Sequence, residues 1–530
     1  GSMPTGRAAR LPRVTTLVRF RLPGCRGGGA PRDLPTLARH AASQPQASPI
    51  PRVTPVKKHY DCIVIGTGPS GQKGAIQAAK LGKTVAVVEK NAVLGGAQIN
   101  TGTIPSKALR EAVLHLTGAN KRGLFGQSYR VKHHVTVADL AAVSQQVIRH
   151  EWDVIRNQFE RNDVELLWGK ARFVGPNHVE VENEEGVDTY SADRFLIAVG
   201  TRPARPPHIP FNDRTIFTSD EILKLDHIPK TMIVVGGGVI GTEYACMLAT
   251  LGVRVTLIEG RAEVLGFLDK EITGAFQYFM RQKGITLRLG EKVESITEIE
   301  NTSATDTAGD GKLVQACLES GKCLKAESLL FAVGRQGVCG ALGLDQVGIE
   351  FDDRERLHVN EHYQTNVDHV YAAGDVIGFP ALASTSMEQG RRAVCHAFDA
   401  QGATNYNTEL FPFGIYAVPE ISMVGKTEEQ LTAEGVPYEV GVAQYREIAR
   451  CQLLGDEQGM LKLIIHQDTH EILGVHVIGT GATELIHIGQ AAMALGGKAD
   501  FFIDNVFNWP TLAECYKVAA YNGMNKLNHV

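Results

Sequence analysis

The sequence lacks features that would point to a membrane protein or a nucleic-acid-binding protein. It has no run of roughly 18 uninterrupted apolar residues, the length that a membrane-spanning helix requires. The body of the chain has no long block of like charge, and the formal net charge is only −4. We therefore expect no membrane and no nucleic acid among its partners, and small molecules are favoured instead.

The cysteines have no spacing typical of a metal or redox site. None belongs to a CxxC pair or another zinc-ligand pattern. The nine are Cys25, Cys62, Cys246, Cys317, Cys323, Cys339, Cys395, Cys451 and Cys515. We expect reduced thiols and no metal site. Cys317 and Cys323 are the only near neighbours, in a segment that we interpret as a variable hairpin.

The first segment, residues 1–59, differs in composition from the rest. It has a single acid, Asp33, and many arginines, among them Arg7, Arg10, Arg13, Arg19, Arg21, Arg26, Arg32 and Arg39. This composition is typical of a mitochondrial transit peptide, and a disordered basic tail is the alternative. We expect the mitochondrial matrix if the segment is a transit peptide, and the cytoplasm otherwise.

A dinucleotide-binding pattern begins directly after residue 59. A β run is followed by Gly66, Gly68 and Gly71 in GxGxxG spacing, then by a helical stretch and a second β run that ends at Glu89. The glycines allow a tight turn and close approach of the backbone to a pyrophosphate, and the carboxylate can accept from ribose hydroxyls. One such motif alone is weak evidence.

The same pattern returns about 170 positions later. Gly236, Gly238, Gly241 and Glu259 repeat it, again with 23 residues from the first glycine to the acid. Two matching units in the correct strand, turn and helix context indicate an internal duplication. We therefore expect two dinucleotides to bind, in a chain long enough for several domains.

Other segments resemble one known family. VLGGAQINTGTIPSKAL at residues 93–109, Gly200 and Gly334 after β runs, and Gly374 with Asp375 are similar to the flavoprotein disulfide reductases. The resemblance runs from about residue 60 to the C-terminus. It implies an α/β fold with two Rossmann-like dinucleotide-binding domains, for FAD and NAD(P), and an α+β C-terminal dimerisation domain.

The resemblance also implies a division of the chain and a set of cofactor-binding residues. The segments are an N-terminal extension at 1–59, an FAD-binding domain at 60–203, an NAD(P)-binding domain at 204–334, a return to the FAD-binding or central domain at 335–404, and a dimerisation domain at 405–530. The residues are Gly66, Gly68, Gly71, Glu89, Gly95, Gly96, Gln98, Thr103, Lys107, Gly200, Gly236, Gly238, Gly241, Glu243, Glu259, Arg261, Gly334, Gly374 and Asp375.

The chain departs from the disulfide reductases where their thiol chemistry takes place. The two redox cysteines of the family correspond to Gln98 and Thr103, and the histidine that serves as base for the thiol corresponds to Trp509. A disulfide substrate would lose its thiol relay, and an indole has no proton to exchange at neutral pH. Both parts of the thiol machinery are absent together.

The machinery for hydride transfer is retained. In the family the lysine of the IPSK segment lies near the flavin and pairs with a glutamate of the second glycine motif, here Lys107 and Glu243. The segments TGTIPSKALR, GIYAVPEISMVGKTEEQL, ELIHIGQA and NWPTLAE resemble the soluble pyridine nucleotide transhydrogenases. The resemblance implies ping-pong hydride transfer between NADPH and NAD⁺ through FAD, with Lys107 and Glu243 as catalytic residues.

The acid of the second motif bears on the choice of nucleotide. Glu259 favours a free 2′-hydroxyl and repels the 2′-phosphate of NADP(H), whereas a transhydrogenase must bind both NAD(H) and NADP(H). Arg261 could supply the countercharge, with bidentate geometry suited to a phosphate. A solvated loop arginine is the alternative.

Two other functions stay open from the sequence. A reduced flavin without a disulfide could act as an NAD(P)H diaphorase or oxidase, passing electrons to a quinone, a dye or oxygen. A non-catalytic protein that keeps FAD only for folding is the other alternative. A homodimer or higher homo-oligomer is expected, because the family completes its active site with the partner's C-terminal segment, here around Trp509 to Glu514.

Overall fold

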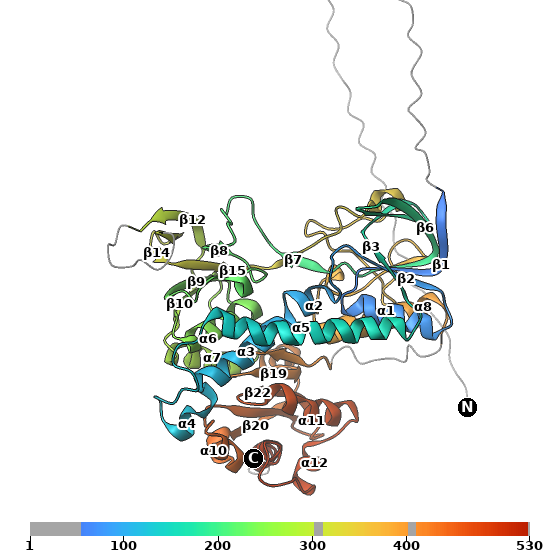
Figure 1. The fold of residues 1–530 in the computed structure, drawn as a ribbon. Helices are drawn as coiled ribbons and strands as arrows, with labels where there is room; N and C mark the ends of the chain where they lie inside the picture. The colour runs from blue at the N-terminus through green and yellow to red at the C-terminus, as the bar shows by residue number, and fades with distance from the viewer. Residues whose placement is uncertain (1–54, 302–310, 401–409, 528–530) are drawn as a thin grey trace, which may run out of the picture. The chain divides into compact units, whose positions relative to one another are not determined.

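The computed structural model describes residues 55–301, 311–400 and 410–527, which belong to one compact unit (Figure 1). They form three main sheets, two of them built on parallel strands and the third antiparallel. Short 3₁₀ helices lie in the connections: η1 (Ala119–Lys121), η2 (Ile222–Lys224), η3 (Leu344–Val347), η4 (Asp375–Ile377) and η5 (Tyr445–Glu447).

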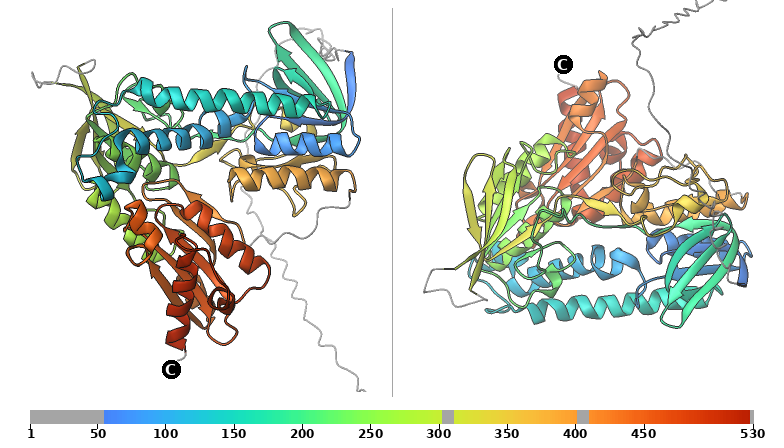
Figure 2. Two further views of the ribbon diagram at one scale, coloured as in Figure 1. Left: turned by 60° about the horizontal axis from the view of Figure 1, so that its bottom comes forward. Right: turned by 90° about the horizontal axis from the view of Figure 1, so that it is seen from above.

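The first sheet has seven strands in the order β3-β2-β1-β6-β5-β4, with β17 also paired to β6. The strands are β1 (Val56–Ile65), β2 (Val85–Glu89), β3 (Glu165–Trp168), β4 (Lys170–Gly175), β5 (His178–Asn183), β6 (Gly186–Ile197) and β17 (Val370–Ala372). The accompanying helices are α1 (Pro69–Lys80), α2 (Gly96–Asn100), α3 (Thr103–Thr117), α4 (Arg122–Phe125), α5 (Val137–Glu160) and α8 (Ala383–Ala397). Helices α1 and α8 lie side by side (Figure 2).

The apolar run of β1 explains why this sheet is buried on both faces. Cys62 and Val64 pack into one apolar cluster with α1, α5 and α8, and Ile63 and Ile65 pack into another with the segment 339–376. Successive side chains of a strand point to opposite faces, so a continuous apolar run suits a sheet that is covered on both sides.

The second parallel sheet has the order β11-β10-β9-β15-β8 and repeats the β–turn–α arrangement of the first. Its elements are β8 (Ile216–Phe217), β9 (Thr231–Val235), α6 (Val239–Leu251), β10 (Arg254–Glu259), α7 (Lys270–Gln282), β11 (Thr286–Leu289) and β15 (Ser328–Phe331). A small antiparallel sheet and a two-stranded ladder accompany it: β12 (Val293–Glu300), β13 (Lys312–Leu318) and β14 (Cys323–Ala326), and β7 (Thr201–Pro203) with β16 (Arg335–Gly337).

The C-terminal sheet is antiparallel, in the order β18-β19-β22-β21-β20. Its strands are β18 (Phe413–Ile415), β19 (Ile421–Gly425), β20 (Tyr438–Gln444), β21 (Met460–His466) and β22 (Ile472–Ile478). Its helices are α9 (Glu428–Glu434), α10 (Ala449–Leu454), α11 (Ala482–Ala494), α12 (Ala499–Asp504) and α13 (Glu514–Leu527). The predicted fold class, two Rossmann-like units and an α+β C-terminal part, is confirmed.

The expectation of reduced thiols is wrong for one pair of cysteines. Cys317 on β13 and Cys323 on β14 are opposite each other in an antiparallel ladder, with their Cα atoms 4.0 Å apart, and they form a disulfide. The hairpin interpretation was correct, but spacing alone did not give the register that brings the two sulfurs together. The other cysteines within the described residues are free and buried: Cys62, Cys246, Cys339, Cys395, Cys451 and Cys515.

The described part of the chain contains no helix with both the length and the apolar character needed to cross a bilayer.

Candidate active site

The first glycine turn joins β1 to α1, and its glycines have different surroundings. A methyl group at Gly66, whose φ is +107°, would lie 2.5 Å from the carbonyl oxygen of Ala198, and one at Gly71 would lie 2.0 Å from the oxygen of Gly66. At Gly68 the nearest such atom is 3.8 Å away. The outer glycines are therefore required by chain packing, whereas the middle one leaves room in front of the helix.

The second turn, between β9 and α6, repeats this arrangement. A methyl group at Gly236 would lie 2.6 Å from the oxygen of Ala332, and one at Gly241 would lie 1.9 Å from the oxygen of Gly236. At Gly238 no atom of the described residues, apart from the glycine and its chain neighbours, lies within 4 Å of that position. Both turns thus keep open space at the same point of the motif.

Each of these middle glycines is also the N-cap of its helix. Gly68 and Gly238 have extended backbone, and no side chain of the described residues caps the first amide groups of α1 or α6. The first amide groups of a helix need acceptors and carry partial positive charge. The two helix ends therefore suit the pyrophosphates that the sequence motifs predict.

Glu89, predicted to bind a ribose, is buried and anchored to the first turn. Its carboxylate accepts hydrogen bonds from the backbone and hydroxyl of Thr67, at 3.2 and 2.5 Å, and from the backbone and side chain of Asn91, at 2.9 and 3.1 Å. The Gly95 amide donates to the Thr67 hydroxyl at 3.0 Å. Glu89 therefore fixes the glycine turn and connects it to the flavin-side segment.

The flavin-side segment lies against this turn. Gly95 and Gly96 both have positive φ, and a methyl group at Gly96 would lie 3.0 Å from the Cα atom of Gly68. The segment continues through α2, which contains Gln98, to Thr103, the first residue of α3. Both of these side chains are partly exposed, so the two positions that hold thiols in the resembling reductases carry an amide and a hydroxyl.

Three segments that are distant in sequence meet at Thr201. Its hydroxyl donates to Asp375 Oδ2 at 3.3 Å and accepts from Arg335 Nε at 2.8 Å. Gly200 and Gly334 immediately precede Thr201 and Arg335 and have φ values of +67° and +82°. The structure therefore brings together the predicted residues around 200, 334 and 375, through a threonine that the sequence analysis did not single out.

Gly374 lies directly beside the first glycine turn. A methyl group there would lie 2.7 Å from the hydroxyl oxygen of Ser70 in α1, and its amide donates to Gln389 in α8 at 2.9 Å. Ser70 in turn donates to the carbonyl oxygen of Ala373 at 3.0 Å. This close packing places Asp375 next to the N-terminal end of α1.

Lys107 and Glu243 form the predicted ion pair. Lys107 Nζ lies 2.7 Å from Glu243 Oε2, with the lysine side chain 24% exposed and the glutamate only 4% exposed. The Tyr416 amide donates to Glu243 Oε1 at 2.8 Å, and Lys107 Nζ lies 4.9 Å from the centre of the Tyr416 ring. The pair thus joins α3 to α6, and the C-terminal part of the chain supports both of its members.

The sequence analysis missed Tyr416 and the neighbouring Arg110. The buried Arg110 guanidinium donates to the Ala417 carbonyl at 3.0 Å and lies 3.0 Å from Glu420 Oε1. Arg110 is one helical turn from Lys107, so α3 is fastened to the segment 416–420 at two points. The signals that could have indicated them were the TGTIPSKALR segment, which ends at Arg110, and the GIYAVPEIS segment, which contains Tyr416; both were used only as resemblances.

Glu259 and Arg261 are paired with each other. Arg261 Nε donates to Glu259 Oε1 at 3.0 Å and its Nη2 donates to Oε2 at 3.2 Å, while the Gly237 amide donates to Oε2 at 2.6 Å. Burial raises the pKa of Glu259, but the hydrogen bonds from Arg261 and Gly237 outweigh it and hold that pKa below its ordinary value. Glu259 is therefore a carboxylate whose charge is already compensated, and Arg261 projects into solvent with 59% of its side chain exposed.

The C-terminal segment that corresponds to the thiol base of the reductases has a different chemistry here. The Trp509 side chain is 68% exposed, and Val506 nearby is 96% exposed. Glu514 Oε2 is enclosed and meets no hydrogen-bond partner among the described residues. Exposed apolar side chains of this size are typical of a surface that another chain covers.

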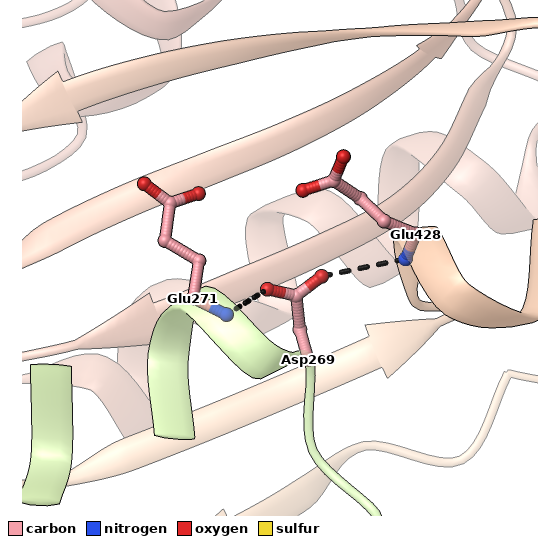
Figure 3. Close-up of side chains that lie close together, drawn as sticks. All are labelled: Asp269, Glu271 and Glu428. Carbon is pink, nitrogen blue, oxygen red and sulfur yellow. Dashed lines mark hydrogen bonds between the residues drawn. The ribbon is translucent and has the colours of Figure 1, made fainter. Parts of the chain in front are cut away.

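A group of three carboxylates resembles a metal site but surrounds a lysine. Asp269, Glu271 and Glu428 lie together between α7 and α9, where Asp269 accepts from the amides of the other two (Figure 3). The fully buried Lys462 Nζ lies 2.8 Å from Asp269 and 3.0 Å from Glu271, and it also donates to Glu428. Burial lowers the pKa of Lys462, but these hydrogen bonds raise it above its ordinary value. The ammonium group of Lys462 therefore occupies the position among the carboxylates that a metal ion would take.

Comparison with known proteins identifies the family. The family profile of the pyridine nucleotide-disulphide oxidoreductases matches residues 60–390, and the profile of their dimerisation domain matches residues 411–520. The chain belongs to the pyridine nucleotide-disulphide oxidoreductase family. It is therefore an oxidoreductase, and family membership implies binding of FAD and NAD(P)H and a homo-oligomer.

Members of the family with high sequence identity share one name. The soluble pyridine nucleotide transhydrogenase of Mycobacterium tuberculosis strain ATCC 25177 / H37Ra is 50% identical over 472 residues, which cover 89% of this chain and 98% of that protein. The protein of the same name from Vibrio parahaemolyticus is 45% identical over 473 residues, covering 88% and 99%.

Solved structures of other proteins share the fold. The Cu(II) complex of the HOCl-induced flavoprotein disulfide reductase RclA from Escherichia coli has a TM-score of 0.77 and 26% identity, covering 87% of this chain and 99% of that one. LpdA from Mycobacterium tuberculosis has a TM-score of 0.77 at 24% identity, covering 87% and 98%.

The expectation of a mitochondrial location is contradicted by these relatives. They come from mycobacteria and vibrios, which are bacteria and have no mitochondria. The arginine-rich composition of residues 1–59 was therefore misread as an organelle signal, and residues 1–54 lie outside the described residues.

Proposed function

We propose that this enzyme transfers hydride between NADPH and NAD⁺ by a ping-pong reaction in which both nucleotides use one site in turn. The observation that carries the proposal is the intact Lys107–Glu243 ion pair beside positions 98 and 103, which carry glutamine and threonine in place of thiols. Transhydrogenase relatives at 43–50% identity support the same reaction. We call the two positions the former thiol positions.

The residues of the first unit fit FAD. The open space at Gly68, the uncapped α1 and the anchored Glu89 would receive the pyrophosphate and a ribose, with Gly95, Gly96 and the 374–375 turn beside them. When bound, FAD supplies the two-electron carrier that both nicotinamides can reach. No thiol lies at the former thiol positions to accept those electrons.

Lys107 provides positive charge at the reaction centre. Its ammonium is held by a carboxylate with 4% exposure and lies over the ring of Tyr416, so its position is fixed before any ligand arrives. A preorganised charge stabilises negative charge that develops beside it, whichever nucleotide is the donor. Glu243 is a positioning residue, because the Tyr416 amide and Lys107 occupy its two oxygens.

The second unit would hold the nicotinamide nucleotides. The uncapped α6 and the space at Gly238 suit the pyrophosphate, and Glu259 and Arg261 would then lie beside the adenosine ribose. For NAD(H), the Glu259 carboxylate accepts from the 2′-hydroxyl. For NADP(H), the exposed Arg261 side chain turns from Glu259 to the 2′-phosphate. The site therefore has one arginine conformation for each nucleotide.

We further propose that the enzyme works as a homodimer, with the domain division given above. The exposed apolar side chains around Trp509 and Val506 favour a partner subunit on this surface.

Initial-rate kinetics test the reaction. With NADPH and NAD⁺ varied together, we expect parallel double-reciprocal lines, NADH as product, and FAD, not FMN, released on denaturation. Faster turnover with a dye, a quinone or oxygen than with NAD⁺ would favour a diaphorase or oxidase instead. No bleaching of the flavin by either reduced nucleotide would favour a non-catalytic protein.

A further inference from the structure

We propose that the Cys317–Cys323 disulfide is a thiol-exchange site that sets how well the enzyme reads the 2′-phosphate of NADP(H). Its reactant is a dithiol, either a small molecule or a dithiol protein. The inference rests on the proposed function, in which NADP(H) and NAD(H) share one site. It concerns the β13–β14 hairpin, a part of the chain that the proposed mechanism does not use.

The disulfide is open to such a reactant. Cys323 is exposed and Cys317 is partly exposed, whereas every other cysteine of the described residues is buried. Thiol attack on this pair therefore requires no unfolding of the chain.

The turn between the two cysteines contacts a second turn at residues 290–292. Lys322 Nζ and Ser320 Oγ bind Glu291 Oε1 at 3.2 and 3.0 Å, and the Glu319 amide donates to the Lys292 carbonyl at 3.0 Å. Hydrogen bonds from Ser320 and Lys322 hold the pKa of Glu291 below its ordinary value. The disulfide thus closes a short loop that holds the 290–292 turn by three contacts.

The 290–292 turn also contacts residues 259–261, the segment proposed to bind the adenosine ribose. The Gly290 amide donates to the Arg261 carbonyl at 2.8 Å, and the Glu291 amide donates to the Glu259 carbonyl at 3.2 Å. A continuous series of hydrogen bonds therefore joins the disulfide loop to residues 259–261. Loosening the loop would loosen the backbone at Arg261.

Glu259 and Arg261 differ in their other contacts. The Glu259 carboxylate is also fixed by the Gly237 amide at 2.6 Å, whereas the Arg261 guanidinium donates only to Glu259 among the described residues, with the charge of Glu263 nearby, and its side chain is 59% exposed. Loss of the backbone anchor should therefore weaken binding of a 2′-phosphate by Arg261 more than binding of a 2′-hydroxyl by Glu259.

The exchange balances as a two-electron reaction. A thiolate of the reactant attacks Cys323 Sγ, the Sγ–Sγ bond breaks, and the Cys317 thiolate leaves, with Gln315 Nε2 as a donor to its sulfur at 3.6 Å. The second thiol of the reactant then releases Cys323 and forms the reactant's own disulfide. Two electrons pass to the cysteine pair, and both sulfurs take up protons.

Native thiol labelling tests the site by itself. The air-oxidised holoenzyme is incubated with or without dithiothreitol and then with iodoacetamide, and each cysteine is read from its own peptide by mass. We expect Cys317 and Cys323 to be labelled only after dithiothreitol, and the six buried cysteines in neither case. Labelling of the pair without reductant, or none after it, would overturn the proposal.

Binding of NADP⁺ and NAD⁺ tests the consequence. By equilibrium dialysis, reduction should weaken NADP⁺ binding about threefold, a typical size for coupling through such a network, and leave NAD⁺ binding nearly unchanged. The Cys317→Ser/Cys323→Ser variant should match the reduced enzyme and no longer respond to dithiothreitol. The reduced wild type gives the same comparison if that variant does not fold.

Equal NADP⁺ affinity in the oxidised and reduced enzyme would refute the coupling. Dialysis needs no turnover, so this outcome is distinct from failure of the proposed function, which would appear as absence of hydride exchange between NADPH and NAD⁺.

Discussion

Lys107 and its two contacts, Glu243 and Tyr416, come from three separate parts of the chain. The ion pair is 2.7 Å long and the ring centre lies 4.9 Å from the ammonium. A lysine held in this way keeps its place whichever nucleotide is bound. The role of each contact can therefore be measured separately by substitution.

Lys107→Ala should slow flavin reduction by NADPH and by NADH to a similar extent. The lost charge would have stabilised the reduced flavin with either donor, so we expect roughly a hundredfold decrease for both. Stopped-flow absorbance measures the two rates, and Lys80→Ala, an exposed lysine of α1, is the control. A decrease confined to one nucleotide would contradict this role.

Tyr416→Leu should weaken the hold on Lys107 while leaving the backbone hydrogen bond to Glu243 in place. Loss of the cation–π contact is worth about 1 kcal/mol, so we expect roughly a fivefold slower reduction and a lower flavin midpoint potential. Tyr416→Phe keeps the ring and should restore both values. If phenylalanine is as impaired as leucine, the hydroxyl and not the ring is responsible.

Glu259→Ala should shift the preference toward NADP(H), because it removes a negative charge near the 2′ position. Since Arg261 already compensates that charge, we expect a gain of only about 1 kcal/mol, at the low end for a like-charge neighbour. Dissociation constants for NADP⁺ and NAD⁺ measure it. Arg261→Ala should shift the preference the other way, and an unchanged ratio in both variants would remove this pair from nucleotide selection.

At the scale of elements, Lys462 on β21 joins the N-terminus of α7 to the N-terminus of α9. It is fully buried among the carboxylates of Asp269, Glu271 and Glu428. Removal of one partner from a buried ion group leaves the remaining charges without compensation. The contact between the second parallel unit and the C-terminal sheet should therefore depend strongly on this lysine.

Lys462→Met should lower the free energy of unfolding by about 3–5 kcal/mol at neutral pH. Lys426→Met, which removes an exposed pair with Glu434, is the control and should cost less than about 1 kcal/mol. Thermal unfolding followed by circular dichroism measures both. Equal shifts in the two variants would mean that the buried cluster contributes no more than a surface pair.

The same cluster predicts how stability depends on pH. Burial raises the pKa of Asp269, but the hydrogen bonds from Lys462 and the Glu428 amide and the nearby positive charges of Lys462 and His476 together outweigh it and hold the pKa below its ordinary value of 3.8. A carboxyl group whose pKa is lowered in the folded state stabilises the protein at pH values above its ordinary pKa. This stabilisation is lost as the pH falls below that ordinary pKa and through the lowered one. Acid unfolding of the wild type should therefore be steeper below about pH 4 than that of Lys462→Met.

At the scale of the whole molecule, the sequence predicted the features that are repeated along the chain or that depend only on neighbouring residues. The paired glycine motifs at 66–71 and 236–241 and the apolar runs of β1 and β9 gave both parallel units, because turn chemistry and strand burial are local properties. The Lys107–Glu243 pair came from the family resemblance, and the structure shows it at hydrogen-bonding distance.

What the sequence did not predict depends on contacts between distant segments. Tyr416 and Arg110 contact residues that are far away in sequence. From the sequence, Lys462 is indistinguishable from other strand lysines, because its three carboxylate partners come from other segments. The Cys317–Cys323 disulfide depends on the register of one hairpin, which spacing does not determine. The composition of the first 59 residues gave a location that the bacterial relatives contradict.

The central claim is that electrons pass between nicotinamides without a thiol beside the flavin. Anaerobic titration with NADPH, followed by NAD⁺ and monitored by flavin absorbance, tests it most directly. We predict full bleaching at a single equivalent of NADPH per flavin, no long-wavelength thiolate-to-flavin band, and return of the oxidised spectrum with NAD⁺. A stable long-wavelength band, or uptake of a second equivalent, would contradict the account.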